Sequence, residues 1–405
     1  MAHLALSAAR RWAGLPHAAR IAIIYIVART ITTLFLIAAA SASTSLSRFG
    51  AEPGLASFVL GWDAQWYWTV AEYGYPTELP LTDSGEVAEN AWAFMPVFAY
   101  VAKIVGMPFG AWGPGAFLIS IVAGYFSCLA LHRLLRERIG RGAATWAVVF
   151  FSAGPLAAMF QVGYAESLFL LLLFLALDAV ARRRYAWLYL LVPVMAFTRP
   201  GVLAFALYLG LHGILRWWRR RDDPLPSSHV LHIVAAGALA TVCGFAWQVI
   251  AAVATGDPGA YLATELSWRR NWLAGGVEGF VPFEGWIQAS QFWFAQWGMP
   301  QAWGPVAVVL IVGGVVATLL CSRSVRALGA DLRLWSASYL LYLLAVFFPQ
   351  SSTFRLLLPI SPLWGAVAVP RSRLWRIGVL AACLLGQWTW IHAVYALGNT
   401  FWQVP

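Results

Sequence analysis

The stretch WAFMPVFAYVAKIVGMPF, residues 92–109, decides how many times this chain crosses a membrane. It is apolar, but it carries Lys103 and two prolines and is shorter than the roughly 20 residues that cross a bilayer. If it crossed, the arginine clusters that follow, beginning with residues 133–141, would lie outside, although cytoplasmic loops are normally the basic ones. We therefore expect 92–109 to be re-entrant or interfacial.

Composition indicates a membrane protein. Of the 405 residues, 61% are hydrophobic and 11% are charged, whereas soluble domains carry about 25% charged residues. Apolar stretches recur from Ile21 to Pro405 with no long polar insert, so we expect one membrane domain over residues 1–405. The net charge of +10 lies in short arginine clusters between apolar runs, which is typical of cytoplasmic loops rather than of nucleic-acid binding.

The predicted fold class is an all-α, polytopic bundle of about eleven transmembrane helices. This topology leaves five arginines and Lys103 outside and keeps the rest of the 27 basic residues at the inner side. Two large outer loops, 42–111 and 255–301, are expected to cap the active site. The predicted spans are residues 21–41, 112–132, 144–162, 165–181, 185–198, 200–217, 229–254, 302–321, 334–350, 355–370 and 374–397.

The first outer loop contains GWDAQWYWTVAEYGYP, residues 61–76. As a helix, it places Asp63 beside Trp66 and Tyr67, which are three and four residues further on. This arrangement is typical of a carboxylate in an aromatic-lined site at the membrane surface. It fits equally well an aromatic-belt helix in which Asp63 only caps the N-terminus. Both interpretations stay open on spacing alone.

Glu166 stands at the outer start of an apolar helix that runs to Ala181. A carboxylate there interacts favourably with the helix macrodipole, which is a sufficient structural reason for its presence. A carboxylate at the membrane edge is also costly to desolvate, and such acids are functional candidates by default. Glu166 is therefore a second candidate site residue.

Two isolated outer arginines, Arg199 and Arg355, lie at breaks between short apolar segments. The planar guanidinium suits bidentate binding of phosphate, although a single arginine can equally snorkel to lipid headgroups. Together with Arg269 and Arg270 in the second outer loop, they favour an anion site. Arg29, inside the first predicted span, is expected to snorkel inward or to pair internally.

Other site chemistries find no support in the sequence. The four cysteines and seven histidines show no metal-ligand spacing, and there is no glycine-rich phosphate loop and no Ser/His/Asp set. We therefore expect no metal and no nucleotide cofactor. A phosphate-bearing substrate on the outer side is then most simply a lipid-linked phosphate that arrives through the bilayer.

Several segments, taken in order, resemble the PIG-V-like mannosyltransferases, relatives of glycosylphosphatidylinositol mannosyltransferase II among the GT-C membrane glycosyltransferases. The similarity covers about residues 58–365, and the segment at 94–100 departs from it, since relatives read closer to FFPLYP there. The matching segments are WDAQWYWTVAEYGYP (62–76), FMPVFAY (94–100), GPLAAMFQVGYAESLFLLLLFLAL (154–177), FTRPGVL (197–203) and STFRLLLPISPL (352–363).

The resemblance implies a GT-C type fold, an active site outside the cytoplasm and a polyprenyl-phosphate-mannose donor. It maps the family's acidic residue of the first outer loop onto Asp63, and we expect the Asp63 carboxylate to act as the catalytic base. Arg199 and Arg355, with Arg269 and Arg270, are expected to bind the donor phosphate. The acceptor or the supporting contacts are expected to involve Glu166, Tyr164, Trp62, Trp66 and Tyr67.

The predicted function is inverting transfer of mannose to a lipid-linked or cell-envelope glycan acceptor. The expected partners are the lipid-linked donor, a glycolipid or glycan acceptor and membrane lipids, with no nucleic acid. The chain has one lysine and no Asn-x-Ser/Thr sequence, which favours a bacterial plasma membrane with the site facing the exterior. A lipid or glycolipid transporter or flippase is the main alternative, and a non-catalytic membrane subunit is another.

Overall fold

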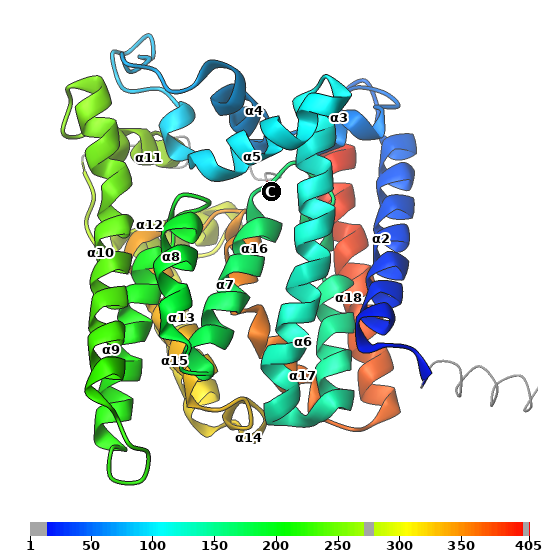
Figure 1. Cartoon of the computed structure of the whole chain (residues 1–405). Coiled ribbons are helices and arrows are strands. Elements are labelled where there is room, and N and C mark those ends of the chain that lie inside the picture. The colour runs from blue at the N-terminus through cyan, green and yellow to red at the C-terminus, as the bar shows by residue number, and fades with distance from the viewer. Residues whose placement is uncertain (1–13, 271–278, 400–404) are drawn as a thin grey trace, which may run out of the picture.

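The structure is a computed structural model that describes residues 14–270, 279–399 and 405. Within these ranges the protein is a bundle of helices with no β-strand, apart from one isolated bridge between Leu81 and Val87 (Figure 1). This confirms the predicted all-α, polytopic membrane fold. Five helical segments of the described chain are long and apolar enough to cross a bilayer: α2 (His17–Ala42), α6 (Trp112–Ser152), α10 (Ser227–Thr255), α13 (Trp303–Cys321) and α18 (Arg373–Ile391), which continues to Leu397 as a π-helical turn.

Helix α6 changes direction at Gly140, where φ is 80° and ψ is 160°. Glycine adopts such a backbone without the steric cost of a Cβ. The chain therefore forms two helices here, in agreement with the two predicted spans. The prediction that the second of these spans reaches residue 162 is wrong, since it ends at Ser152. Pro155 follows almost at once, and proline disfavours helical backbone in the residue before it.

Several apolar helices are too short to cross a bilayer alone. Helix α8 has nine residues and is about 14 Å long, against roughly 30 Å of hydrocarbon. The short helices are α7 (Glu166–Ala181), η4 (Tyr185–Trp187), α8 (Leu188–Ala196), α9 (Val202–Trp218), α15 (Ala330–Val346), α16 (Thr353–Leu356), η5 (Leu358–Leu363) and α17 (Trp364–Ala368). Of these, α8 and α9 lie on either side of Arg199, where the sequence predicts short apolar segments. Helix ends inside a membrane must be buried in protein or line a cavity.

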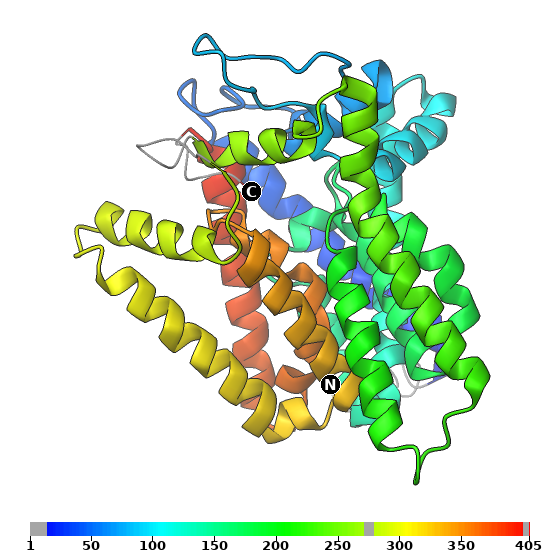
Figure 2. The ribbon, with the colours of Figure 1, turned by 90° about the vertical axis from the view of Figure 1, so that its left-hand side faces the viewer.

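Most of the short helices of the two outer loops lie at the end of the bundle that is uppermost in Figure 1, and α12 lies lower than the others. Figure 2 shows α11 and α4 at this same end, above the tops of the short helices. Helix α5 has eleven residues and is about 16 Å long, so the segment at 92–109 does not cross the membrane, as predicted. The outer helices are α3 (Leu55–Val59), α4 (Asp63–Tyr73), η1 (Ala91–Ala93), α5 (Pro96–Gly106), η2 (Met107–Phe109), α11 (Ala260–Arg270) and α12 (Glu284–Gln296).

Residues 153–165 are largely buried although they form only one 3-10 turn, η3 (Ala157–Phe160). Backbone polar groups inside a membrane protein need partners from the protein. Arg29 of α2 supplies two of them, because Nη1 donates to the Ala157 carbonyl at 2.5 Å and Nη2 donates to the Ser152 carbonyl at 2.6 Å. Arg29 therefore pairs internally and holds the segment that leads to helix α7.

Candidate active site

Asp63 is the first residue of α4 and does not act as its N-cap, which is Trp62. Trp62 has a φ of 57° and a ψ of −129°, a conformation that costs a non-glycine residue of order 1–3 kcal/mol. The indole Nε1 of Trp62 donates to the Val394 carbonyl at 3.2 Å, and this contact helps to hold the strained turn. This excludes the interpretation in which Asp63 only caps the helix. The Asp63 carboxylate instead accepts a hydrogen bond from another part of the chain.

The other charged residues of the site come from three breaks between short helices. Glu166 begins α7, Arg199 follows the end of α8, and Arg355 lies in the single turn of α16. Glu166 and Arg199 are buried, with 1% and 7% of their surfaces exposed. The short helices thus bring their polar ends together inside the bundle, below the layer of α4, α5 and α11 (Figure 1).

These four residues, which we call the outer charge cluster, are in direct contact. Arg355 Nη1 donates a hydrogen bond to Asp63 Oδ2. The same nitrogen lies 3.4 Å from Glu166 Oε1, and Arg199 Nη1 lies 3.2 Å from that oxygen. Two carboxylates and two guanidinium groups therefore neutralise each other in a buried site, where unpaired charges would be strongly destabilising.

The outer charge cluster retains unused hydrogen-bonding capacity. Among the side chains that the structure describes, Glu166 Oε1, Arg199 Nη1 and Arg355 Nε are buried atoms with no aligned hydrogen-bond partner. Burial without a partner costs free energy, so such atoms in a folded protein call for an explanation. Two guanidinium groups with free donors can bind an anion such as phosphate.

Two buried tyrosines lie near the cluster, and one of them contacts it. The Tyr164 hydroxyl accepts a hydrogen bond from the Asp63 backbone N–H at 3.1 Å, and the Arg355 guanidinium lies 5.2 Å from the centroid of the Tyr164 ring. Tyr67 is on the buried face of α4. Burial, and then the negative charge of Glu166, raise the pKa of Tyr67 well above its usual value. Its hydroxyl therefore stays protonated near the cluster.

Aromatic side chains of α4 and α11 pack together close to Asp63. Trp66 stacks on Phe94 with ring centroids 5.7 Å apart and meets Trp268 edge-on at 5.9 Å. Tyr67 packs edge-on against Phe94 at 5.3 Å. Trp66 and Tyr67 thus lie beside Asp63 on one helix, as predicted, and α11 contributes Trp268 to the same wall. Aromatic faces of this kind are common partners of sugar rings and other amphipathic ligands.

Arg269 and Arg270 have partners other than the cluster. Arg269 Nη2 donates to the Val346 carbonyl at 2.5 Å. Arg270 Nε lies 2.9 Å from Glu86 Oε2, and its Nη1 donates to the Val87 carbonyl at 3.0 Å. Within the described ranges, neither arginine forms an ion pair with Asp63 or Glu166. The structure thus joins Arg199 and Arg355, but not all four arginines, to the two acids.

Two further polar residues near the site were not given a role from the sequence. The Arg48 guanidinium lies 4.2 Å from the centroid of the Trp62 ring, and its isolated position in an outer loop was the available signal. Burial raises the pKa of Glu265, on α11, to about 6, although Tyr261 donates a hydrogen bond to it and Arg269 is nearby. No local sequence pattern distinguishes Glu265 from an ordinary loop acid.

An apolar groove of about 620 Å³ lies against the same turn that carries Arg355. Phe354 and Leu357, on either side of Arg355 in the sequence, line it together with Trp364 of α17 and Trp390 of α18. We call it the α17–α18 groove. Its hydroxyl groups are satisfied locally, because Ser361 donates to the Leu358 carbonyl at 2.6 Å and Thr389 to the Gly386 carbonyl at 3.0 Å. The groove thus offers an apolar surface to a hydrocarbon chain.

No family model and no curated protein matches the sequence. The structure is similar to the Archaeoglobus fulgidus oligosaccharyltransferase in complex with zinc and sulfate, with 14% identity, a TM-score of 0.43, and coverage of 90% of this chain and 53% of that chain. A structure of the same oligosaccharyltransferase tethered to an acceptor peptide gives 13% identity, a TM-score of 0.36 and coverage of 92% and 55%. This chain spans about half the length of that protein. Likeness at this level carries no argument about substrate or activity, so the function rests on the site itself.

Proposed function

We propose that this chain is an inverting glycosyltransferase of the GT-C type, which transfers mannose from polyprenyl-phosphate-mannose to a lipid-linked or cell-envelope glycan acceptor. The site would face the exterior of a bacterial plasma membrane. The observation that carries the proposal is the buried contact of Asp63 and Glu166 with Arg199 and Arg355, beside an apolar groove. A base, an anion site and a place for a lipid chain thus lie within one small region.

The arginines provide the anion site for the donor. A sugar phosphodiester is an anion, and guanidinium groups bind phosphate oxygens through charge-assisted hydrogen bonds. Arg355 is shared between Asp63 and Glu166 before the donor binds. An arriving phosphate competes with these carboxylates for Arg355, and Glu166 keeps Arg199 in place at 3.2 Å. The donor itself thereby releases Asp63 from its guanidinium partner.

Asp63 then acts as the base in a single displacement. The acceptor hydroxyl oxygen attacks the anomeric carbon from the face opposite to the phosphate, and its proton passes to the Asp63 carboxylate. The bond between the anomeric carbon and the phosphate oxygen breaks, and its electron pair stays on the phosphate. Arg199 and Arg355 stabilise the charge that develops there, as preorganised donors do in other enzymes. One displacement inverts the configuration at the anomeric carbon.

The lipid part of the donor fits the α17–α18 groove. Because Phe354 and Leu357 line the groove and Arg355 lies between them, a lipid in the groove can place its phosphate at the cluster. The acceptor would approach from the outer side, where Trp66 and Trp268 form the aromatic wall. In this arrangement α4, α5 and α11 form a cap over the reacting groups.

Reconstituted protein with radiolabelled polyprenyl-phosphate-mannose tests the proposal. We expect label to move to a glycolipid acceptor, and activity to survive EDTA because arginines already neutralise the phosphate. Movement of the intact lipid across the vesicle membrane without sugar transfer would instead identify a flippase. If neither sugar transfer nor lipid movement occurred with any acceptor fraction, the result would favour a non-catalytic subunit. Loss of activity in EDTA and its return with a divalent cation would overturn the metal-free mechanism.

A bulky residue in the α17–α18 groove tests the place of the lipid chain. Thr389→Phe should raise KM for a long-chain donor severalfold and leave KM for a donor with a short isoprenoid chain unchanged. Thr241→Phe is the matched control, because Thr241 also donates its hydroxyl to a carbonyl of the preceding helical turn and lines a different groove. Equal effects of Thr389→Phe on both donors would remove the groove from the mechanism.

A further inference from the structure

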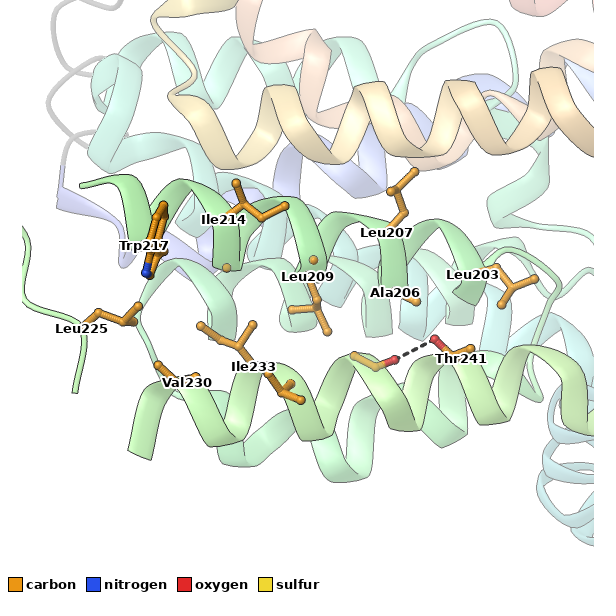
Figure 3. A pocket seen from close by; sticks show the side chains of 14 residues that line it. Leu203, Ala206, Leu207, Leu209, Ile214, Trp217, Leu225, Val230, Ile233 and Thr241 are labelled. Atoms are coloured by element: carbon orange, nitrogen blue, oxygen red, sulfur yellow. Dashed lines mark hydrogen bonds between the residues drawn. The ribbon is translucent and has the colours of Figure 1, made fainter. Parts of the chain in front are cut away.

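A second apolar groove, of about 700 Å³, lies between α9 and α10 and shares no lining residue with the α17–α18 groove. Figure 3 shows its lining, with Leu203 and Thr241 towards one end and Trp217, Leu225 and Val230 towards the other. From Leu203 to Trp217 the groove follows α9 for about 21 Å, which is longer than one leaflet of roughly 15 Å. We call it the α9–α10 groove.

The α9–α10 groove is a narrow seam between two helices in contact. A Cβ added at Gly213 would lie 3.2 Å from Ile233, and one added at Gly244 would lie 2.3 Å from Leu203, so the helices pack closely at these positions. At Gly210, by contrast, a Cβ would meet no atom within 4 Å. The remaining space suits a single hydrocarbon chain rather than a helix, which has a diameter of about 10 Å.

The inner end of this groove is strongly basic. Directly after Trp217 and Trp218 come Arg219, Arg220 and Arg221, all of which are exposed. The Arg220 guanidinium lies 4.1 Å from the centroid of the Trp217 ring, which itself lines the groove. The arginine distribution predicts that this end faces the cytoplasm.

Most of the nearby negative charge is already neutralised. Asp223 lies 2.7 Å from Arg183 and 3.2 Å from Arg216. Asp222 is then the remaining acid of the loop beside the three consecutive arginines. The loop therefore offers a net positive surface at the mouth of an apolar groove.

We propose that the α9–α10 groove binds one anionic phospholipid of the inner leaflet, with an acyl chain along the groove and the phosphate at Arg219, Arg220 and Arg221. Basic pockets between transmembrane helices on the cytoplasmic side bind anionic lipid headgroups in this way. This site is independent of the proposed glycosyl transfer. It lies at the inner end of the bundle, whereas the outer charge cluster lies below α4, α5 and α11 (Figure 1).

Native mass spectrometry of protein extracted from vesicles of equal parts phosphatidylglycerol and phosphatidylcholine tests this site. Wild-type protein should retain one phosphatidylglycerol in at least tenfold preference to phosphatidylcholine. Gly210→Leu fills the groove and should reduce retention of both lipids at least tenfold. Gly314→Leu, at an exposed glycine of α13 with equal free space, is the matched control and should retain lipid as the wild type does.

The charge requirement is tested separately by replacing Arg219, Arg220 and Arg221 together with Gln. This variant should lose the preference for phosphatidylglycerol while it still retains a lipid. The control replaces three exposed inner arginines elsewhere, Arg323, Arg326 and Arg373, and should keep the preference. Equal retention in Gly210→Leu and wild type, equal preference after the triple replacement, or a second copy of the chain in place of lipid would each overturn the proposal.

Discussion

Two buried polar networks, one at each end of the bundle, differ in how their hydrogen bonds are used. In the outer charge cluster, Arg355 is shared by two carboxylates, and three buried atoms have no aligned partner. At the inner end, Arg216 donates to the Tyr185 hydroxyl at 3.0 Å, Tyr185 lies 3.0 Å from His212 Nε2, and His212 Nδ1 lies 2.7 Å from Asp331. We call this second network the inner polar cluster.

Donors and acceptors match along the series of hydrogen bonds in the inner polar cluster, although Arg216 Nε, 3.2 Å from Asp223 Oδ2, is itself a buried atom with no aligned partner among the described residues. Arg216 donates to Tyr185, the tyrosine hydroxyl donates to Nε2 of His212, and the Nδ1–H of His212 donates to Asp331. These contacts tie the inner ends of η4, α9 and α15 together. The difference between the two networks is one of degree: three hydrogen bonds in series hold the inner polar cluster, whereas the contacts of Glu166 with Arg199 and Arg355 are ion pairs without aligned hydrogen bonds. We therefore expect the inner polar cluster to stabilise the bundle, and the proposed function gives the catalytic role to the outer charge cluster.

The largest effect is expected for Asp63→Asn. An amide cannot take the proton of the acceptor, so kcat should fall by about 10²–10⁴-fold, the usual contribution of a general base. Steady-state kinetics with the lipid-linked donor measure this change. The matched control is Asp331→Asn, which makes the same substitution in the inner polar cluster and should leave kcat within about twofold of wild type. A wild-type kcat in Asp63→Asn would contradict the proposal that Asp63 is the catalytic base.

The next largest effect is expected for Arg355→Lys. Lysine keeps the charge but loses the planar fork that binds two phosphate oxygens, so KM for the donor should rise and kcat should fall, together by about 10–100-fold in kcat/KM. Arg216→Lys in the inner polar cluster should lower Tm without changing kcat/KM per folded molecule. An equal loss of kcat/KM in both variants would mean that the two networks do not differ in function.

Asp331→Asn should have a moderate effect on stability. The His212 ring would lose its charged acceptor, and the free energy of unfolding should fall by about 1–3 kcal/mol. Thermal unfolding in detergent, followed by tryptophan fluorescence, gives the change in Tm. A Tm unchanged from wild type would show that the inner polar cluster does not stabilise the bundle.

The smallest effect concerns Glu265, which is near the outer charge cluster but outside it. Its pKa is raised by burial to about 6 from an ordinary 4.5, so the folded protein binds a proton more readily than the unfolded chain. Its contribution to stability is therefore full below pH 4.5 and is lost as the pH rises through about 6. Glu265→Gln should raise Tm by a few degrees at pH 7.5 and by little at pH 4.5.

Glu78→Gln, at an exposed outer loop position, controls for the loss of one negative charge and should show no such difference between the two pH values. If Glu265→Gln behaved in the same way as Glu78→Gln, Glu265 would be an ordinary solvated carboxylate. If Glu265→Gln instead abolished transfer at both pH values, Glu265 would be one of the catalytic residues and would have to be included in the outer charge cluster.

Most of the helices could be predicted from the sequence, because apolar runs and the arginine-rich loops between them are local patterns. The non-crossing segment at 92–109 followed from the arginine distribution together with the segment's short length and two prolines, and the eleven-residue α5 agrees with it. The end of α6 was wrongly predicted because residues 155–162 are apolar and can be read as a continued helix. Pro155 argues against a continued helix, because proline disfavours helical backbone in the residue before it. Arg29, which is buried, donates to two carbonyls that such a helix would have used internally.

The contacts within the site could be predicted only in part. Asp63, Glu166, Arg199 and Arg355 could be placed on one side of the membrane, but the hydrogen bond from Arg355 to Asp63 joins residues 292 positions apart. Partners at that separation depend on how helices pack. For the same reason the sequence could not show that Arg270 pairs with Glu86 rather than with the site acids.

The most direct test of the outer charge cluster as the active site is an experimental structure with a bound, non-reactive polyprenyl-phosphate-sugar analogue. We predict a phosphate oxygen within about 3 Å of the guanidinium groups of Arg199 and Arg355, the lipid chain in the α17–α18 groove, and Asp63 facing the anomeric carbon. A phosphate bound instead at Arg269 and Arg270, or at the inner arginines 219–221, with the contact between Arg355 and Asp63 intact, would contradict it.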